Sequence, residues 1–270
     1  MKTAELKKYF DKTNQKVIKY LLKSDNKHPV KTLHELRVEI KKIRFISHLI
    51  QHFDKQSDAG KLYKPYEKVF KKAGKIRTLQ MQNKLIYQFE LTELFDDIIK
   101  ENNKTGKKLL KKFFKESEIQ SEVLNAYKPM ILASIDKTIH PDIESYSNHL
   151  VRFLYDNLSD KTKPENLHEL RKDVKELIFI GKFSKELRTF ISKRIKLKLA
   201  DNLQDKIGGW HDKGDLQKSM TEELVRIKKP ERIKYQMAIS KIKAAMNKDL
   251  KEIKLLVADF HQNINLITLK

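Results

Sequence analysis

The chain has 270 residues and no cysteine, which excludes disulfide bonds and thiolate metal sites. It carries 58 Lys and Arg residues against 36 Asp and Glu residues, and its net charge of +22 is spread over both halves, which favours a polyanionic partner. The hydrophobic content of 39% is enough for a packed core and argues against disorder. No apolar run has the length of a signal peptide or a membrane span, so we expect a cytoplasmic protein.

The predicted elements are all helices, because apolar residues recur with a helical period and seven glycines and six prolines leave little room for hairpins. In the first half we expect a helix from about Leu6 to Asp25-Asn26, then helices at about 31–53, 65–99, 107–115 and 118–138, with a break at 102–106. After a restart at His140-Pro141 we expect helices at about 142–158, 165–207, 209–227 and 231–262, with breaks at Gly208-Gly209 and Pro230. The predicted fold class is therefore all-α.

The pentapeptide Leu-His-Glu-Leu-Arg occurs twice, at residues 33–37 and 167–171, an offset of 134 residues. Seven of the thirteen positions are identical between 33–45 and 167–179. Without a gap, the same offset aligns Gly74 with Gly208, Arg77 with His211 and Thr78 with Asp212. Such a repeat predicts one domain built of two pseudo-twofold-related helical bundles, residues 1–136 and 137–270.

The first copy of the repeat predicts a helix with one basic face. At about 100° per residue, this face spans an arc of roughly 80° and consists of His34, Arg37, Lys41, Arg44 and His48. No acidic residue lies in the arc and large apolar residues border it, which is typical of the wall of a groove. In the second copy the same arc carries His168, Arg171, Lys175 and Lys182, while Ile178 replaces Arg44.

Further candidate cations lie outside this face: Arg77, Lys84 and His211 around the second motif, and Arg194 with Lys198 as a helical pair at i and i+4. Gly74 and Gly208 have two interpretations at this point, because a glycine either permits a close approach of two helices or marks a helix break. The histidines do not predict a metal site, since the spacing His-x-x-Arg supplies no second ligand. Four lysines at positions 12, 16, 19 and 23 are interpreted as a solvated face.

These motifs resemble those of the CHAD family, the conserved histidine α-helical domain. The resemblance rests on His34-Glu35-Leu36-Arg37-Val38 with Lys41-Lys42-Ile43-Arg44, on His168-Glu169-Leu170-Arg171, and on residues 203–212, which resemble a Leu-Gly-x-x-His-Asp stretch of that family. It implies two pseudo-symmetric helical bundles around a basic groove that binds inorganic polyphosphate, often at polyphosphate granules. It carries this role to His34, Arg37, Lys41, Arg44, His168, Arg171 and Lys175. Thr78 departs from the family pattern, which commonly has Asp there, and the Glu-x-Glu-x-Lys signature of a fused CYTH triphosphatase domain is absent from the sequence.

The predicted function is therefore non-catalytic binding of polyphosphate, with no cofactor. A nucleic-acid-binding protein is the alternative, although the sequence has no helix-turn-helix, zinc-finger or RNP signature. A phosphohydrolase or phosphotransferase is less favoured, because there is no Walker motif. Its carboxylate pairs, Glu35 with Glu39 and Glu169 with Asp173, are expected to face away from the basic arc and to serve solubility.

Overall fold

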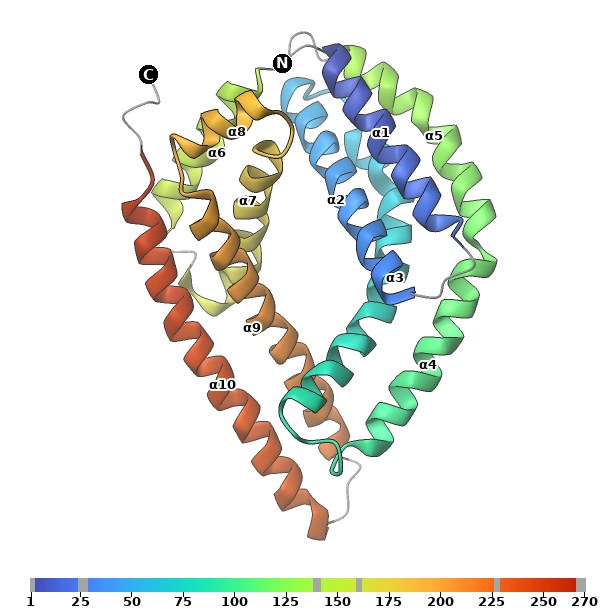
Figure 1. Cartoon of the computed structure of the whole chain (residues 1–270), viewed down its shortest axis with the longest axis vertical. Coiled ribbons are helices and arrows are strands. Elements are labelled where there is room, and N and C mark those ends of the chain that lie inside the picture. The colour runs from blue at the N-terminus through green and yellow to red at the C-terminus, as the bar shows by residue number, and fades with distance from the viewer. Residues whose placement is uncertain (1–2, 24–28, 138–141, 159–161, 226–228, 266–270) are drawn as a thin grey trace. The chain divides into compact units, whose positions relative to one another are not determined.

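The computed structural model describes residues 3–23, 29–137, 142–158, 162–225 and 229–265. This part of the chain contains ten α-helices, short 3-10 segments and no strand, so the predicted all-α class is confirmed (Figure 1). The α-helices are α1 (Thr3–Leu21), α2 (Pro29–Phe53), α3 (Ala59–Gln88), α4 (Asp96–Lys115), α5 (Ser117–Lys137), α6 (Ile143–Asn157), α7 (Leu167–Ile180), α8 (Lys185–Ser192), α9 (Leu197–Leu224) and α10 (Lys229–Gln262), and η2 is Pro164–Asn166.

The chain divides into two compact units. Unit 1 comprises Met1–Met81 and Asp97–Asp142, and unit 2 comprises Gln82–Asp96 and Ile143–Lys270. Residues 82–96, at the end of α3 and beyond it, therefore belong to unit 2. They are held there by Tyr235 on α10, whose hydroxyl donates to the carbonyl oxygen of Leu94 at 3.0 Å and whose ring lies 4.5 Å from that of Phe95.

In unit 1, α1 lies beside α2 and α5 (Figure 1). The helical spacing of Leu6, Phe10 and Val17 gives α1 one apolar face, and all three side chains are fully buried. Burial of each such side chain stabilises the fold by about 1.5–3 kcal/mol. One buried polar pair crosses this core: the hydroxyl of Tyr66 on α3 donates to Oδ1 of Asn14 on α1 at 2.7 Å.

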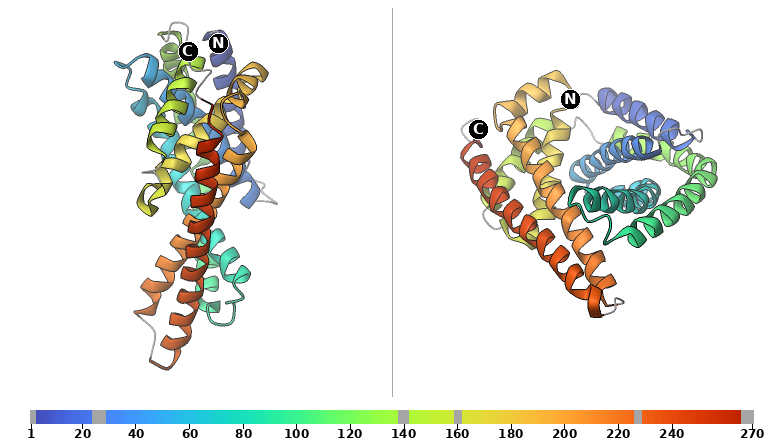
Figure 2. Two further views of the ribbon diagram at one scale, coloured as in Figure 1. Left: turned by 90° about the vertical axis from the view of Figure 1, so that its left-hand side faces the viewer. Right: turned by 60° about the horizontal axis from the view of Figure 1, so that its bottom comes forward.

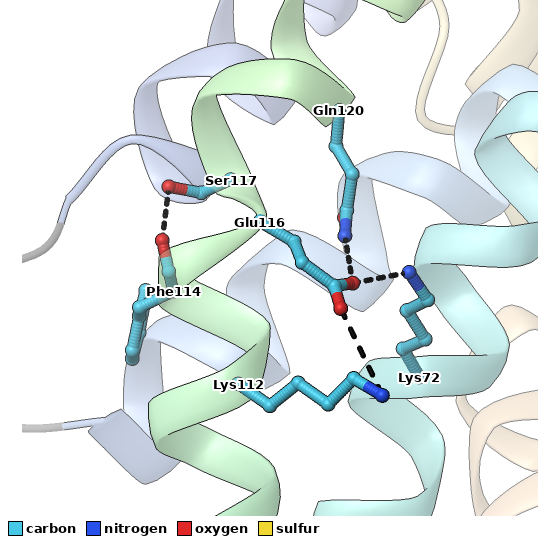
Figure 3. A network of polar contacts seen from close by, with 6 residues as sticks. All are labelled: Lys72, Lys112, Phe114, Glu116, Ser117 and Gln120. Carbon is cyan, nitrogen blue, oxygen red and sulfur yellow. Dashed lines mark hydrogen bonds and ion pairs between the residues drawn. The ribbon is translucent and has the colours of Figure 1, made fainter.

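The junction between α4 and α5 is tied to α3 through Glu116 (Figure 3). Its carboxylate accepts from Nζ of Lys72 on α3 at 2.6 Å and from Nε2 of Gln120 at 3.3 Å, and Nζ of Lys112 lies 4.0 Å away. The hydrogen bond from Lys72 is the main reason that the pKa of Glu116 is lowered. At the same place Ser117 donates to the carbonyl oxygen of Phe114 at 2.7 Å, which satisfies a group at the end of α4.

In unit 2, α9 packs against α7 and α10, and both views in Figure 2 show α9 and α10 running side by side. An ion-pair network joins these two helices. Asp249 on α10, which is 7% exposed, accepts from Nζ of Lys213 at 2.6 Å and lies 3.0 Å from Nζ of Lys206. Lys206 also pairs with Glu252, one turn further along α10.

Several predicted helix boundaries are wrong. Helix α9 runs through Gly208 and Gly209, α4 runs through 102–106, and α3 ends at Gln88 rather than near 99. The predicted helix at 165–207 is three helices, with turns at 181–184 and 193–196. An interior glycine costs a helix only about 1 kcal/mol, which packing along the rest of a long helix outweighs. The boundaries predicted at Asp25-Asn26 and His140-Pro141 lie outside the described residues.

Candidate anion-binding surfaces

In unit 1, α2 and α3 together present a cluster of cations. His34, Arg37 and Lys41 lie on successive turns of α2, and Arg77 lies on α3. Arg77 is their neighbour, because its charge acts on both His34 and Arg37. His34 is exposed and the other three side chains are half-buried. We refer to these four residues as the unit 1 surface.

The guanidinium of Arg37 lies against α3. Its Nη1 donates to the carbonyl oxygen of Phe70 at 2.7 Å, and its Cζ lies 3.8 Å from the centre of the Phe70 ring, the geometry of a cation–π contact. A Cβ at position 74 would lie 2.5 Å from Nη1, so the guanidinium occupies space that only glycine leaves open. Burial, and then the charge of Arg77, lower the pKa of Arg37 to about 10, which still leaves it charged at neutral pH.

Unit 2 repeats this arrangement with Arg171 of α7 lying against α9. Nε of Arg171 donates to the carbonyl oxygen of Gln204 at 3.0 Å, and a Cβ at position 208 would lie 2.9 Å from its Cζ. The helix-break interpretation of the glycines is wrong, because α3 and α9 run through them, and the group that approaches each glycine is an arginine side chain. We refer to the exposed His168, the half-buried Arg171 and Lys175 of α7, and His211 of α9 as the unit 2 surface.

The unit 2 surface has fewer permanent charges than the unit 1 surface. The position of Arg77 is taken by His211, whose ring centre lies 5.5 Å from that of His168. Nδ1 of His211 lies 3.4 Å from Oδ2 of Asp215, an acidic residue one turn along α9. The neighbouring acid Asp212 lies where unit 1 has Thr78. An anion would therefore meet a weaker positive field in unit 2 at neutral pH.

Positive charges lie close together at the unit 1 surface. Although His34 is exposed overall, partial burial of its ring lowers its pKa, and the charges of Arg77, Lys41 and Arg37 lower it further. The carboxylate of Glu35 acts in the opposite direction. Such a cluster offers N–H donors to phosphate oxygens, and a bound anion would relieve its mutual repulsion. Among the described residues, no group of three or more His, Asp or Glu side chains is arranged to hold a metal ion.

The remaining predicted binding residues are scattered. Arg44 and His48 continue the basic face of α2 beyond Lys41, and the charge of Arg44 opposes the burial that raises the pKa of Tyr63 to about 12. Lys84 is exposed on α3, in the part that belongs to unit 2. Lys182 does not lie on the predicted helical arc, because α7 ends at Ile180 and Lys182 follows in a turn.

The predicted surface pair of Arg194 and Lys198 is wrong. Arg194 is only 5% exposed and precedes α9, so it does not share a helix with Lys198. Its Nε donates to Oδ1 of Asn148 at 2.6 Å and its Nη1 donates to the carbonyl oxygen of Phe190 at 2.9 Å. Burial lowers the pKa of Arg194. This arginine therefore joins α6 to α8 inside unit 2.

The predicted solubility role is wrong for Glu39. Its side chain is buried, at 4% exposure, rather than facing solvent. It lies 2.6 Å from Nζ of Lys42 and 3.9 Å from Nζ of Lys16 on α1. Burial, and then the charge of Glu39, raise the pKa of Tyr9. Lys16, expected on a solvated face, thus balances a buried charge between α1 and α2.

Sequence reasoning missed a third basic surface, on α4. The lysine face of α4 spans an arc of roughly 100° at helical spacing. It consists of the exposed residues Lys100, Lys104, Lys107, Lys108, Lys111 and Lys115. The sequence shows lysines at helical spacing over residues 98–115, but the helix break predicted at 102–106 divided this pattern into two parts.

Comparison with known proteins identifies the fold. No family model and no curated protein matches the chain. A solved structure does match: the CHAD domain from the plant Ricinus communis superposes with a TM-score of 0.64 and 13% sequence identity, over 95% of this chain and 91% of that one. The chain therefore has the fold of a CHAD domain, as the resemblance of its motifs predicted. None of the described helices combines the length and the apolar character that crossing a membrane requires.

Proposed function

We propose that the protein binds inorganic polyphosphate, without hydrolysing it, at the unit 1 and unit 2 surfaces. The observation that carries this proposal is the concentration of like charge at the unit 1 surface, where Arg77, Lys41 and Arg37 all act on His34. The CHAD fold supports the choice of ligand, since the motif resemblance implies polyphosphate. The proposal also places the protein in the cytoplasm, at polyphosphate granules where these form.

The chemistry of the two surfaces suits a phosphate chain. Arginine forms paired hydrogen bonds with phosphate oxygens in a fixed plane, and lysine supplies a mobile point charge. Binding should release counterions and weaken steeply with salt, as it does for nucleic acids. Polyphosphate has no bases and needs no stacking platform, and the ring of Phe70 at the unit 1 surface is already covered by Arg37.

We also infer that the two units arose by internal duplication. The offset of the repeat relates buried residues on α1 to buried residues on α6: Thr13 to Ser147 and Val17 to Val151. It relates Val69 to Leu203 and Ala73 to Ile207 in the same way on α3 and α9. This correspondence supports two phosphate-binding surfaces of common origin, one in each unit.

The experiment that tests the function is calorimetric titration with long-chain polyphosphate at two salt concentrations. The test variant is Lys41→Glu/Lys175→Glu, which reverses one charge on each surface. The control variant is Lys104→Glu/Lys111→Glu, which makes the same change in net charge on the lysine face of α4. We expect the wild type to bind, the test variant to lose at least about tenfold in affinity, and the control to lose much less. Equal losses in both variants would show diffuse attraction and contradict the proposal.

Two further measurements separate the alternatives. Competition with RNA at equal phosphate concentration tests nucleic-acid binding, and we expect polyphosphate to be preferred. Incubation of polyphosphate with the protein and Mg²⁺ tests phosphohydrolase activity, and we expect no release of phosphate. Preference for RNA would contradict the ligand, and released phosphate would contradict the non-catalytic role.

A further inference from the structure

We propose that Gly74 and Gly208 are positioning residues, which seat the guanidinium groups of Arg37 and Arg171 for phosphate binding. This inference rests on the proposed function. It starts from a geometry that occurs once in each unit. In both, an arginine bonds to a backbone carbonyl on the neighbouring helix and covers the glycine that lies four residues further along that helix.

The geometry is retained although the side chains around it differ. Phe70 supplies the carbonyl in unit 1 and Gln204 supplies it in unit 2, at equivalent positions. Arg37 donates through Nη1 and Arg171 donates through Nε. What the two sites share is therefore an arginine, the helical carbonyl to which it donates, and the glycine that it covers. We call this arrangement of carbonyl and glycine the arginine seat.

The glycine makes the carbonyl accessible. In an α-helix, the carbonyl of residue i accepts the N–H of residue i+4, so the carbonyl of residue 70 is already the acceptor for Gly74. A carbonyl oxygen has a second lone pair, which here receives the arginine. A Cβ at position 74 would lie 2.5 Å from Nη1 of Arg37, and one at position 208 would lie 2.9 Å from Cζ of Arg171. Any other residue would push the guanidinium away from the carbonyl.

Helix stability alone does not explain these glycines. Both lie in the interior of long helices, α3 and α9, where alanine is the more stable residue. Gly106 in α4 offers a contrast, because a Cβ there would make only an ordinary contact, at 4.0 Å from Cδ1 of Leu79. The close approach of an arginine thus distinguishes Gly74 and Gly208 from a glycine that merely occupies a helix.

A seated guanidinium is a better phosphate ligand than a free one. A flexible arginine loses rotamer freedom when it binds, whereas a side chain already fixed by a carbonyl and a helix surface has lost it beforehand. The planar group keeps further N–H donors for phosphate oxygens after one is used on the carbonyl. Arg37 is fixed in this way beside His34 and the charge of Arg77, within the cluster that an anion would neutralise.

The test is Gly74→Ala/Gly208→Ala, which leaves the net charge of +22 unchanged. We expect polyphosphate affinity to fall by roughly tenfold, because each guanidinium loses its fixed orientation. The control is Gly106→Ala, which makes the same chemical change without touching an arginine and should leave affinity within about twofold. Unchanged affinity in the double variant, or an equal loss in the control, would overturn the inference.

A double-mutant cycle checks that the glycines act through the arginines. In a background of Arg37→Lys/Arg171→Lys, which has the same charge but no guanidinium to seat, the glycine substitutions should have no further effect on affinity. Equal effects in both backgrounds would overturn the inference. Thermal unfolding is measured alongside, and a fall in melting temperature with unchanged affinity would show a structural role only. If Lys41→Glu/Lys175→Glu weakens binding while Gly74→Ala/Gly208→Ala does not, the positioning role of the glycines is contradicted and the proposed function is still supported.

Discussion

The ring of His211 lies 5.5 Å from the ring of His168 in unit 2, at the position where unit 1 places Arg77 beside His34. One surface therefore carries a permanent charge where the other carries a second imidazole. Burial, the charge of Lys172 and then His211 lower the pKa of His168 below its ordinary value, so His168 is neutral at pH 7. The unit 1 surface should therefore attract an anion more strongly than the unit 2 surface at neutral pH.

The first prediction is that polyphosphate affinity rises as the pH falls from about 7.5 towards 5.5, through the ordinary pKa of histidine. Both His34 and His168 have lowered pKa values, so they gain charge only late in this range when no ligand is bound. A bound polyanion favours the charged imidazolium and draws this protonation to higher pH. For the free protein the sign is opposite: the unfolded chain binds more protons, so these groups reduce stability on acidification.

Substitution of His34 and His168 locates this pH dependence. His34→Gln/His168→Gln should flatten the profile, because it removes both groups whose pKa values are lowered. His211→Arg should raise affinity at pH 7.5, because it adds a permanent charge. His149→Gln, on the exposed side of α6, is the control and should leave the profile unchanged. Titration calorimetry across the range gives the profiles. The same slope in all four proteins would show that these histidines do not face the ligand.

A second prediction concerns Asp249 and the stability of unit 2. Burial acts to raise its pKa, but hydrogen bonds from Lys213 and Lys206 outweigh this and lower it. The stabilisation of unit 2 by ionised Asp249 is therefore complete above the pKa of Asp in the unfolded chain. It is lost as the pH falls through the lower pKa of Asp249 in the folded protein. Asp249→Asn should cost about 1–3 kcal/mol in urea unfolding at pH 7, because it leaves two lysines without their buried carboxylate.

The control for Asp249 is Glu252→Gln in the same network. Glu252 also pairs with Lys206, but its side chain is 42% exposed. Its loss should cost under about 1 kcal/mol, since solvent screens such a pair. The difference between Asp249→Asn and wild type should shrink as the pH falls below about 4. A difference that stays constant down to acid pH would show that the carboxylate is not the stabilising group.

The helices could be predicted from the sequence because their apolar faces repeat over many turns. Leu6, Phe10 and Val17 of α1 are examples, and all are buried as their spacing predicts. The ends of helices depend on fewer residues and were less predictable. The glycines of α9 resembled a helix break in the sequence. The side chain that occupies the space beside Gly208 is Arg171 on α7, and no residue near Gly208 in the sequence indicates this contact.

The candidate site could be predicted only in part, for a related reason. The basic face of α2 follows from spacing along one helix, and the structure places Arg77 beside it. Burial of a charged residue, in contrast, depends on partners distant in sequence. Arg194 is held by Asn148, 46 residues away, and Glu39 has Lys16 of α1 at 3.9 Å in addition to its local partner Lys42. No periodic pattern in the sequence signals such long-range pairs.

A third prediction follows from the placement of Arg194. Arg194→Gln should destabilise unit 2 by about 2 kcal/mol, because it removes hydrogen bonds from a charged group to Asn148 and to the carbonyl oxygen of Phe190. Polyphosphate affinity at a temperature where the variant is folded should change less than about twofold, in contrast to Arg171→Gln. Urea unfolding and calorimetry measure the two quantities. A large loss of affinity at unchanged stability would contradict this structural role and show that Arg194 contributes to polyphosphate binding.

The last prediction separates fast attraction from specific binding, using the lysine face of α4. Its lysines are exposed to solvent, so salt screens their charges beyond about one Debye length, roughly 8 Å at physiological salt. Lys104→Gln/Lys108→Gln/Lys111→Gln should therefore slow association with polyphosphate at low salt and leave the dissociation rate nearly unchanged. Lys41→Gln/Lys175→Gln should mainly speed dissociation, because these lysines lie one turn from the seated arginines. Stopped-flow measurements at two salt concentrations resolve both rates. Faster dissociation of the α4 variant, equal to that of the Lys41→Gln/Lys175→Gln variant, would make the lysine face part of the binding site itself.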